Sequence, residues 1–215
     1  MKHSVLVIGL GRFGTAAALE LMALGHDVLV VDQDEARVND LAADVTHAVQ
    51  TDASDEDALR SIGAAEFQHA IVAMSGNSEA SIFATMALKN LGVGNVVAKA
   101  ASALHGRILE RIGADRVVYP EREMGTRVGH TFSIPNVIDY IDVAPKFGIV
   151  KVHPPAAFVG QTLRELDMAN RYRLTPIALR RGGEVTVNPQ RDEKIQANDE
   201  LILIGLDEGL ERLGR

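Results

Sequence analysis

Short apolar runs alternate with longer amphipathic segments along the first half of the chain. Each run has the length of a strand that is buried on both faces, and the segments between the runs carry apolar residues at helical spacing. The predicted strands are Val5–Ile8, Asp27–Val31, Thr46–Gln50, His69–Val72, Asn95–Lys99 and Arg116–Val118, and the predicted helices are Arg12–Leu24, Glu35–Leu41, Asp55–Ile62, Ser78–Leu91 and Ala103–Ile112. Right-handed crossovers between such strands produce a doubly wound parallel sheet. We therefore expect an α/β fold with a Rossmann-like sheet in residues 1–119.

A single helix is expected after this sheet, over Glu121–Thr131. Its apolar residues stand on one face at helical spacing, and they are Met124, Val128 and Phe132. This stripe packs either on its own domain or on a second subunit. Pro135 breaks the helix, and a shorter apolar stretch, Val137–Val143, follows. We assign residues 120–145 to crossover helices that join two domains and contribute to a dimer.

The remaining residues, 146–215, have a different pattern. Alternation of polar and apolar positions predicts strands at Ile149–His153, Thr175–Arg180, Glu184–Val187 and Glu200–Gly205, with helices near Leu163–Met168 and Asp207–Leu213. Turn-forming pairs separate them, namely Pro154-Pro155, Gly182-Gly183 and Asn188-Pro189. The sequence thus predicts a small α+β C-terminal domain, which is short for the substrate-binding half of an enzyme.

The loop after the first strand has the spacing of a nucleotide-binding turn, Gly9-Leu10-Gly11-Arg12-Phe13-Gly14. Gly9 permits the tight turn, Gly11 lets backbone N–H groups approach a pyrophosphate, and Gly14 lets the helix pack on the strand. The helix directs its positive dipole end at phosphate. Asp32 ends the second strand, where a carboxylate accepts hydrogen bonds from ribose hydroxyls and disfavours the 2′-phosphate of NADP. The alternative is a glycine-rich helix start that binds nothing, and the motif does not distinguish NAD, ADP and ATP.

Small and polar residues follow the other strands, at the edge where parallel sheets bind ligands. The candidate nucleotide-binding residues are Gly9, Gly11, Arg12, Phe13, Gly14, Asp32, Asp52, Ala53, Ala73, Asn77 and Lys99, and the loop 73–77 belongs to the same pocket. Asp52 either contacts adenine or caps the next helix, and Asn77 either touches the ligand or caps its own helix. Lys99 ends a buried strand and is expected to face the pocket rather than solvent.

Two helix starts carry charged residues with different expected roles. Arg12 lies at a helix N-terminus, where a cation opposes the helix dipole and costs about 0.3–1 kcal/mol unless an anion lies nearby. A bound phosphate would reverse that balance, and a solvated arginine is the alternative. Glu121 and Glu123 lie in the first turn of a later helix, where carboxylates already stabilise the dipole without a ligand.

Composition narrows the class of protein. Hydrophobic residues make up 47% of the 215, the net charge is −7 and no basic stripe is present, which argues against a nucleic-acid partner. No apolar stretch approaches the roughly 18 residues that span a bilayer, and the first strand begins by Ser4 without room for a signal peptide, so we expect a cytosolic protein. The absence of cysteine excludes disulfides and thiolate chemistry. The seven histidines lack metal-ligand spacing.

The arrangement of both halves resembles the cytosolic regulatory subunits of Ktr and Trk potassium uptake systems, which contain RCK domains. The resemblance covers essentially the whole chain. The matching residues are 9–14, Asp32, Gly113-Ala114-Asp115, 120–125 (Pro-Glu-Arg-Glu-Met-Gly) and 136–140 (Asn-Val-Ile-Asp-Tyr), then Gly160, Leu163, Leu166, Tyr172, Gly182, Pro189, Ile195 and Asp199. Asn198 stands where the tail commonly has glycine, and asparagine also tolerates a positive φ.

The resemblance implies a non-enzymatic regulatory subunit that forms a homo-oligomer, a ring of Rossmann-fold dimers that is usually an octamer. The ring would dock under a membrane channel subunit of KtrB or TrkH type, at the inner face of the cell membrane. ATP and ADP would compete for the pocket, with NAD(H) as an alternative ligand, and their exchange would gate potassium flow.

The resemblance also implies individual roles. Arg12 reaches the terminal phosphate of ATP held by the neighbouring subunit, and Glu121 holds Mg²⁺ or Ca²⁺ at the phosphates. Some relatives bind cyclic di-AMP in the C-terminal lobe, where Arg180 and Arg181 either recognise such an anion or are simply solvated.

Two other functions share the glycine motif. An NAD-dependent dehydrogenase needs a positioned proton donor and substrate-binding groups, and no histidine or lysine pair after the sheet offers an obvious set. A redox-sensing transcription regulator needs a basic DNA-binding module, and the acidic balance argues against one. We therefore expect a ligand-gated regulatory subunit, with an NAD-dependent oxidoreductase or NAD(H)-binding redox sensor as the alternative.

Overall fold

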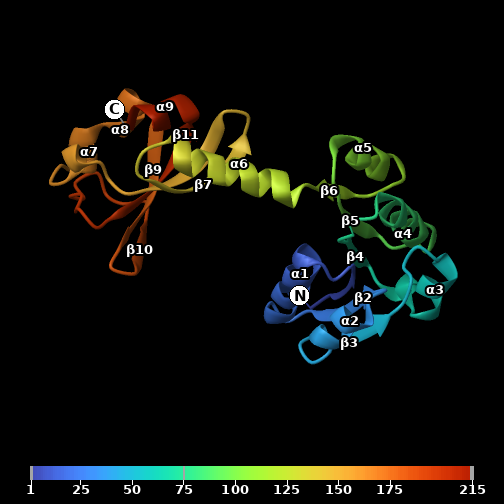
Figure 1. Ribbon diagram of the computed structural model, residues 1–215. Helices are drawn as coiled ribbons and strands as arrows, with labels where there is room; N and C mark the ends of the chain where they lie inside the picture. Colours follow the sequence, from blue (N-terminus) through green and yellow to red (C-terminus); the bar gives the residue numbers. More distant parts are fainter. Residues whose placement is uncertain (1, 75, 214–215) are drawn as a thin grey trace. The chain divides into compact units, whose positions relative to one another are not determined.

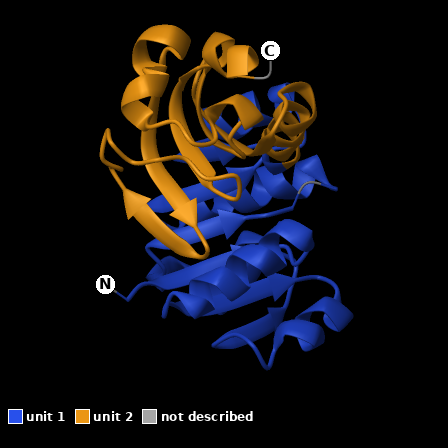
Figure 2. Ribbon diagram, turned by 90° about the vertical axis from the view of Figure 1, so that its left-hand side faces the viewer, with its two compact units in different colours: residues 1–120 blue, residues 121–215 orange. Residues whose placement is uncertain are grey.

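The structure, a computed structural model, describes residues 2–74 and 76–213. They form two compact units, residues 1–120 and residues 121–215, drawn in different colours in Figure 2. The finer division into 1–119, 120–145 and 146–215 stays a prediction. No helix within the described residues is long and apolar enough to cross a membrane.

Unit 1 contains a parallel sheet of six strands in the order β3-β2-β1-β4-β5-β6 (Figure 1). The strands are β1 (Ser4–Ile8), β2 (Asp27–Asp32), β3 (His47–Gln50), β4 (His69–Val72), β5 (Asn95–Lys99) and β6 (Arg116–Val118). The helices are α1 (Arg12–Ala23), α2 (Glu35–Leu41), α3 (Glu56–Ser61), the short η1 (Ala64–Glu66), α4 (Ser78–Asn90) and α5 (Ala103–Arg111). The strand order reverses at β1, so the expected doubly wound, Rossmann-like sheet is confirmed.

The two faces of this sheet are covered by different helices. Val5 and Val7 of β1 belong to a core cluster with α1 and α2, whereas Leu6 and Ile8 belong to a cluster with α3, α4 and α5. Successive side chains of a strand point to opposite faces, so a strand covered on both sides is apolar at every position. This is why the sequence shows continuous apolar runs in unit 1.

Asp115 fastens the last strand of this sheet. Its Oδ2 accepts hydrogen bonds from the Val96 N–H at 2.7 Å and from Lys89 Nζ at 3.0 Å. The bond from Val96 is the largest cause that holds the pKa of Asp115 below its usual range, and Lys89 adds to it. The carboxylate thus joins the start of β6 to β5 and α4. Asp115 is one of the residues that carry the resemblance to Ktr and Trk subunits, and its role in this structure is to hold these elements together.

Unit 2 contains an antiparallel sheet of five strands in the order β10-β9-β11-β8-β7. The strands are β7 (Val137–Ala144), β8 (Phe147–Val152), β9 (Leu174–Arg181), β10 (Glu184–Val187) and β11 (Glu200–Leu206). The helices are α6 (Pro120–Ser133), which begins at the end of unit 1, then η2 (Ala156–Phe158), α7 (Leu163–Leu166), α8 (Met168–Tyr172) and α9 (Asp207–Leu213). Val150, Leu174, Leu201 and Leu203 lie in its core. The expected small α+β lobe is confirmed.

The expectation of crossover helices throughout 120–145 is wrong for its second half. Helix α6 ends at Ser133, and Asn136 takes a φ of +63° after Pro135. The chain then enters β7, which pairs antiparallel with β8. Proline removes the helical hydrogen bond, and the β-branched residues that follow favour a pleated strand.

A buried tyrosine joins three elements of unit 2. Tyr140 of β7 stacks on the His130 ring of α6 with centroids 3.8 Å apart, and its hydroxyl donates to Asp207 Oδ1 at 2.8 Å. A Cβ at Gly148 would lie 2.5 Å from the Tyr140 side chain, so glycine makes room for it. Burial first, and then the bond to Asp207, raise the pKa of the Tyr140 hydroxyl, which therefore keeps its proton and donates it.

A buried carboxylate, Asp199, precedes β11. It accepts hydrogen bonds from Arg181 Nε at 2.8 Å, from Arg181 Nη2 at 2.9 Å and from the Gln196 N–H at 2.8 Å. Burial alone would raise the pKa of Asp199, but the bonds from Arg181 and Gln196 outweigh it and hold that pKa below its usual range. The charge therefore stabilises the fold above the pKa of an unfolded aspartate, about 3.9, and this stabilisation is lost as the pH falls through the lower folded-state value.

We expect Asp199→Asn to lower the free energy of unfolding by about 2–4 kcal/mol near pH 6, because the substitution leaves the Arg181 guanidinium without its buried partner. The difference between the two proteins should shrink as the pH falls below about 4. Urea unfolding followed by circular dichroism over this pH range measures both effects. A difference that is independent of pH would show that the charge of Asp199 does not stabilise unit 2.

Candidate nucleotide-binding site

The carboxyl ends of β1, β2 and β4 meet at one edge of the sheet in unit 1. Ile8 pairs with Val31 on one side and with Val72 on the other. The Gly9 N–H donates to the Val31 carbonyl at 2.8 Å, and the Ala73 N–H donates to the Ile8 carbonyl at 2.7 Å. The loops that leave these strands therefore start side by side, at the edge where open parallel sheets bind ligands.

The three glycines of the glycine turn, Gly9, Gly11 and Gly14, have different surroundings. Gly9 has a φ of +92°, and a Cβ there would lie 2.7 Å from Met74 Cγ. A Cβ at Gly14 would lie 1.9 Å from the Gly9 carbonyl oxygen. Nothing in the described residues lies within 4 Å of a Cβ placed at Gly11. Gly9 and Gly14 are thus required by the fold, whereas Gly11 leaves open space in front of α1.

Helix α1 begins at this open space. Gly11 is its N-cap and offers no side chain to the free N–H groups, and the first turn contains no acidic residue. Arg12 is exposed, and no ion pair of Arg12 is found within residues 2–74 and 76–213. Unpaired N–H groups, a dipole and a cation together make this helix start suitable for a phosphate.

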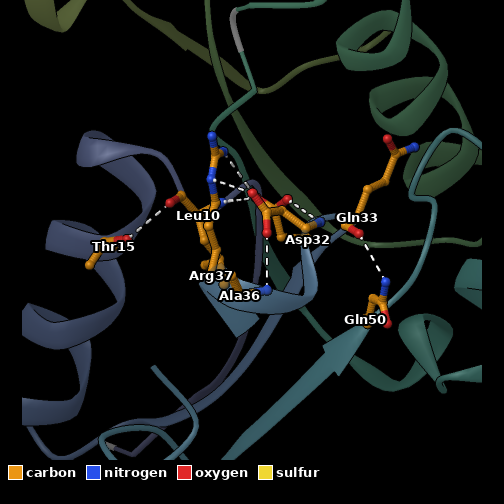
Figure 3. A network of polar contacts seen from close by, with 8 residues as sticks. Leu10, Thr15, Asp32, Gln33, Ala36, Arg37 and Gln50 are labelled. Atoms are coloured by element: carbon orange, nitrogen blue, oxygen red, sulfur yellow. Dashed lines mark hydrogen bonds and ion pairs between the residues drawn. The ribbon is translucent and has the colours of Figure 1, made fainter. Parts of the chain in front are cut away.

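Asp32 lies beside the glycine turn and is held in one orientation (Figure 3). Its Oδ2 accepts the Leu10 N–H at 2.6 Å and its Oδ1 accepts the Asp34 N–H at 2.9 Å, and the side chain is 11% exposed. The Thr51 N–H donates to the Asp32 carbonyl at 3.1 Å, so the end of β3 also reaches this point. The oriented carboxylate has further lone pairs that suit the two hydroxyls of a ribose.

Asp52 and Ala53 follow β3 and differ in environment. Asp52 is exposed and accepts hydrogen bonds from the Ser54 hydroxyl at 2.6 Å and the Ser54 N–H at 2.9 Å, which together hold its pKa below the usual range. The residue that caps α3 is Asp55. Ala53 is buried in the core of unit 1. Asp52 is thus a turn residue at the edge of the sheet where β3 ends, while Ala53 packs in the core and is not exposed to a ligand.

Ala73 and Asn77 lie in the loop after β4. Ala73 is buried, and the Asn77 side chain accepts the Ala80 N–H at 3.1 Å, which makes it the N-cap of α4. The capping alternative for Asn77 is therefore the contact that the structure contains. Ser75, in the predicted loop 73–77, lies outside the described residues.

Lys99 at the end of β5 and Phe13 in the first turn of α1 are brought together by the fold. The Lys99 side chain at the end of β5 is only 7% exposed, and its Nζ lies 5.9 Å from the centroid of the Phe13 ring. A cation over an aromatic face at this distance is attracted by the ring. The contact places the end of β5 beside the glycine turn, with the Lys99 charge in the interior rather than in solvent.

One charged residue at this edge is missing from the set predicted by sequence. Arg37 in the first turn of α2 has its Nη1 3.7 Å from Asp32 Oδ2 (Figure 3). Its Nε lies 3.3 Å from Asp34 Oδ2. The signal that could have revealed it is the one that singled out Arg12, because both place a cation where it opposes a helix dipole.

Glu121 and Glu123 lie in the first turn of α6, and both have interaction partners in the structure. In the part of the chain that the structure describes, no group of three or more His, Cys, Asp or Glu residues is arranged to hold a metal ion. The divalent-cation role of Glu121 stays a prediction.

Arg180 and Arg181, expected either to recognise an anion or to be solvated, both have partners in the C-terminal lobe. Arg181 binds Asp199 through two hydrogen bonds, and its Nη1 donates to Glu193 Oε1 at 3.0 Å. Arg180 Nη1 lies 3.1 Å from Glu200 Oε2. Arg181 is 35% exposed, and its guanidinium is already engaged by two carboxylates within unit 2.

Known protein families match both units. The TrkA-N domain model matches residues 5–120, and the TrkA-C domain model matches residues 148–215. The chain belongs to the TrkA family. Two Bacillus subtilis (strain 168) members of this family are similar over nearly their whole length. Ktr system potassium uptake protein C is 40% identical over 205 residues, 95% of this chain and 93% of that protein, and Ktr system potassium uptake protein A is 36% identical over 206 residues, 96% and 93%.

Solved structures share the fold of this TrkA-family chain at lower identity. The GsuK RCK domain superposes with a TM-score of 0.70 at 20% identity, covering 100% of this chain and 48% of the other. The GsuK channel bound to NAD superposes with a TM-score of 0.67 at 21% identity, covering 99% and 39%. The chain thus spans about half or less of those chains. The expected RCK-type fold and the resemblance to Ktr and Trk proteins are confirmed.

Gly11 and Gly14 provide a matched pair of substitutions. We expect Gly11→Ala to change the free energy of unfolding by less than about 1 kcal/mol, because its Cβ enters open space, and yet to weaken nucleotide binding by about tenfold or more. Gly14→Ala should instead unfold or strongly destabilise unit 1, because its Cβ meets the Gly9 carbonyl. Thermal unfolding and calorimetric titration with ATP measure the two effects. Unchanged ATP affinity in Gly11→Ala would show that the phosphates do not pass this residue.

Proposed function

We propose that this protein is a nucleotide-sensing regulatory subunit of a potassium uptake system. The observation that carries the proposal is the oriented carboxylate of Asp32 beside the open glycine turn, in a chain 40% identical to a Ktr system protein. The subunit is cytoplasmic, sits at the inner face of the membrane and acts on a separate KtrB- or TrkH-type channel subunit. It is a regulator and not an enzyme.

ATP and ADP are the proposed ligands, and they compete for one site. The ribose is held by Asp32, the phosphates by the N-terminus of α1, and the adenine lies towards Asp52. NAD(H) is the alternative ligand, since the GsuK channel, which shares the fold, has been solved with NAD. Cyclic di-AMP stays a prediction for unit 2, without Arg181 as its anchor.

The proposed mechanism needs a contact that only ATP makes, because a ligand shifts a conformational equilibrium only through its differential affinity for the two states. Arg12 is suited to this contact: it is exposed and lies at the phosphate end of the site. In the proposed oligomer, Arg12 of one subunit binds the terminal phosphate held by its neighbour.

Two exposed apolar surfaces support assembly into a ring. The first lies on the adjoining helices α4 and α5 and consists of Phe83, Met86, Leu104 and Ile108. The second lies on α6 and consists of Met124, Val128 and Phe132, with Phe132 88% exposed. A closed ring built from dimers needs two different interfaces on each subunit, and these surfaces supply them. An octamer is the proposed size.

Calorimetric titration of the nucleotide-stripped protein with ATP, ADP and NADH tests the function. We expect tight binding of ATP and ADP and weak binding of NADH. Binding of NADH alone would contradict the proposal and favour a redox sensor or dehydrogenase.

Arg12→Ala should lower the ratio of ATP affinity to ADP affinity by about tenfold, because a charge-assisted contact to the terminal phosphate is lost. Arg60→Ala is the matched control, since it removes an equal charge from an exposed ion pair with Glu56 in the same unit. The same titrations measure both variants. An unchanged ATP to ADP ratio in Arg12→Ala would contradict the role of Arg12.

Glu121→Gln should remove the effect of Mg²⁺ or Ca²⁺ on ATP affinity, because a carboxylate near phosphates needs a divalent cation between them. Glu123→Gln, in the same helix turn, is the control and should keep that effect. Titration with ATP at several divalent-cation concentrations distinguishes the two variants. If Glu121→Gln retains the full dependence, the cation is held elsewhere.

A further inference from the structure

Arg37 faces the carboxylate that would bind the ribose. Its Nη1 lies 3.7 Å from Asp32 Oδ2 (Figure 3). Its Nε lies 3.3 Å from Asp34 Oδ2, so the guanidinium is shared between two carboxylates. The Arg37 side chain is 54% exposed, against 11% for Asp32. Arg37 therefore reaches Asp32 from the solvent side, the side from which a ligand arrives.

The free lone pairs of Asp32 are few. One bond to each oxygen is already made from inside the fold, by the Leu10 N–H to Oδ2 and by the Asp34 N–H to Oδ1. Ribose hydroxyls must donate to the remaining lone pairs on the solvent side of the carboxylate. On that side, Oδ2 faces the Arg37 guanidinium. A ribose and Arg37 thus compete for the same oxygen.

We propose that Arg37 is an internal competitor of the ribose at Asp32 and thereby sets the affinity of the site for adenosine nucleotides. Binding releases Arg37 from Asp32, and Asp34 retains it through the closer contact of its Nε. The inference rests on the proposed nucleotide-binding function. It adds a residue that sets the affinity of the site and whose role is to weaken binding.

The competition has a definite size. An ion pair that contributes about 0.4–1 kcal/mol lies within the range for exposed pairs, so removal of the contact between Arg37 and Asp32 should strengthen binding by about two- to fivefold. The effect should be equal for ATP and ADP, which carry the same ribose.

The direction in which nucleotide affinity changes distinguishes competition at Asp32 from a simple effect of charge. Arg37 is a cation near a polyanionic ligand, so long-range attraction alone predicts that its removal weakens binding. Competition predicts the opposite. Loss of the Asp34 charge also gives opposite predictions. Competition predicts weaker nucleotide binding, because Arg37 would then pair fully with Asp32. Simple charge predicts stronger binding, because a negative charge near an anionic ligand is removed.

The experiment compares Arg37→Gln and Asp34→Asn with the unsubstituted protein, by calorimetric titration with ATP, with ADP and with 2′,3′-dideoxy-ATP. Asparagine caps helices as well as aspartate does, so Asp34→Asn keeps the cap that Asp34 provides for α2. Lys2→Gln is the control for charge, since Lys2 forms an exposed ion pair with Asp27 at the start of β2, at the other edge of the sheet. Thermal unfolding checks that each variant is folded.

We expect Arg37→Gln to bind ATP and ADP about two- to fivefold more tightly and Asp34→Asn to bind them more weakly. Neither variant should bind the dideoxy nucleotide more tightly, because it lacks the hydroxyls that compete. Unchanged or weaker ATP binding in Arg37→Gln, or an equal gain with the dideoxy nucleotide, would overturn the competition alone. Failure of the unsubstituted protein to bind any adenosine nucleotide would instead contradict the proposed function.

Discussion

The close approach of α1 to the end of β1 is the constraint on which the candidate site depends. A Cβ at Gly14 would lie 1.9 Å from the Gly9 carbonyl oxygen, so the helix can begin where it does only with glycine at this position. That contact brings the uncapped N–H groups of α1 to the edge where β1, β2 and β4 end. The phosphate end of the site is therefore a consequence of backbone packing in unit 1.

Asp32 connects this backbone geometry to the chemistry of a nucleotide. Its carboxylate receives the Leu10 N–H from the glycine turn and the Asp34 N–H from the start of α2. The same two bonds that close the loops also orient the oxygens that suit a ribose. In the proposed site the ribose end is thus pre-oriented before a ligand binds, which would lower the ordering cost of binding.

How much the sequence reveals differs between the two units. In unit 1, strands covered on both faces must be apolar throughout, so the strands and the α-helices between them could be predicted. The same pattern indicates the edge where β1, β2 and β4 end as the candidate site. In unit 2, β7 was missed because its apolar residues follow a helix and only the break at Pro135 marks the change. The pairing of Arg181 with Asp199 was missed because the two residues are distant in sequence and are brought close only by the pairing of β9 with β11. Local patterns predict elements and turns, whereas ion pairs between strands depend on tertiary register.

In the proposed mechanism, different residues set the overall affinity for adenosine nucleotides and the preference for ATP over ADP. ATP and ADP share adenine and ribose, so contacts at Asp32 and Arg37 change the affinity for both by the same factor and leave their ratio unchanged. Only groups at the phosphate end, such as Arg12, favour one over the other and shift the conformational equilibrium. A sensor of the ATP to ADP ratio also needs each ligand to exchange, because a nucleotide bound too tightly reports past rather than present concentrations. A weak competitor at the ribose end meets this need, since it speeds exchange of both ligands without altering the contacts by which they are distinguished.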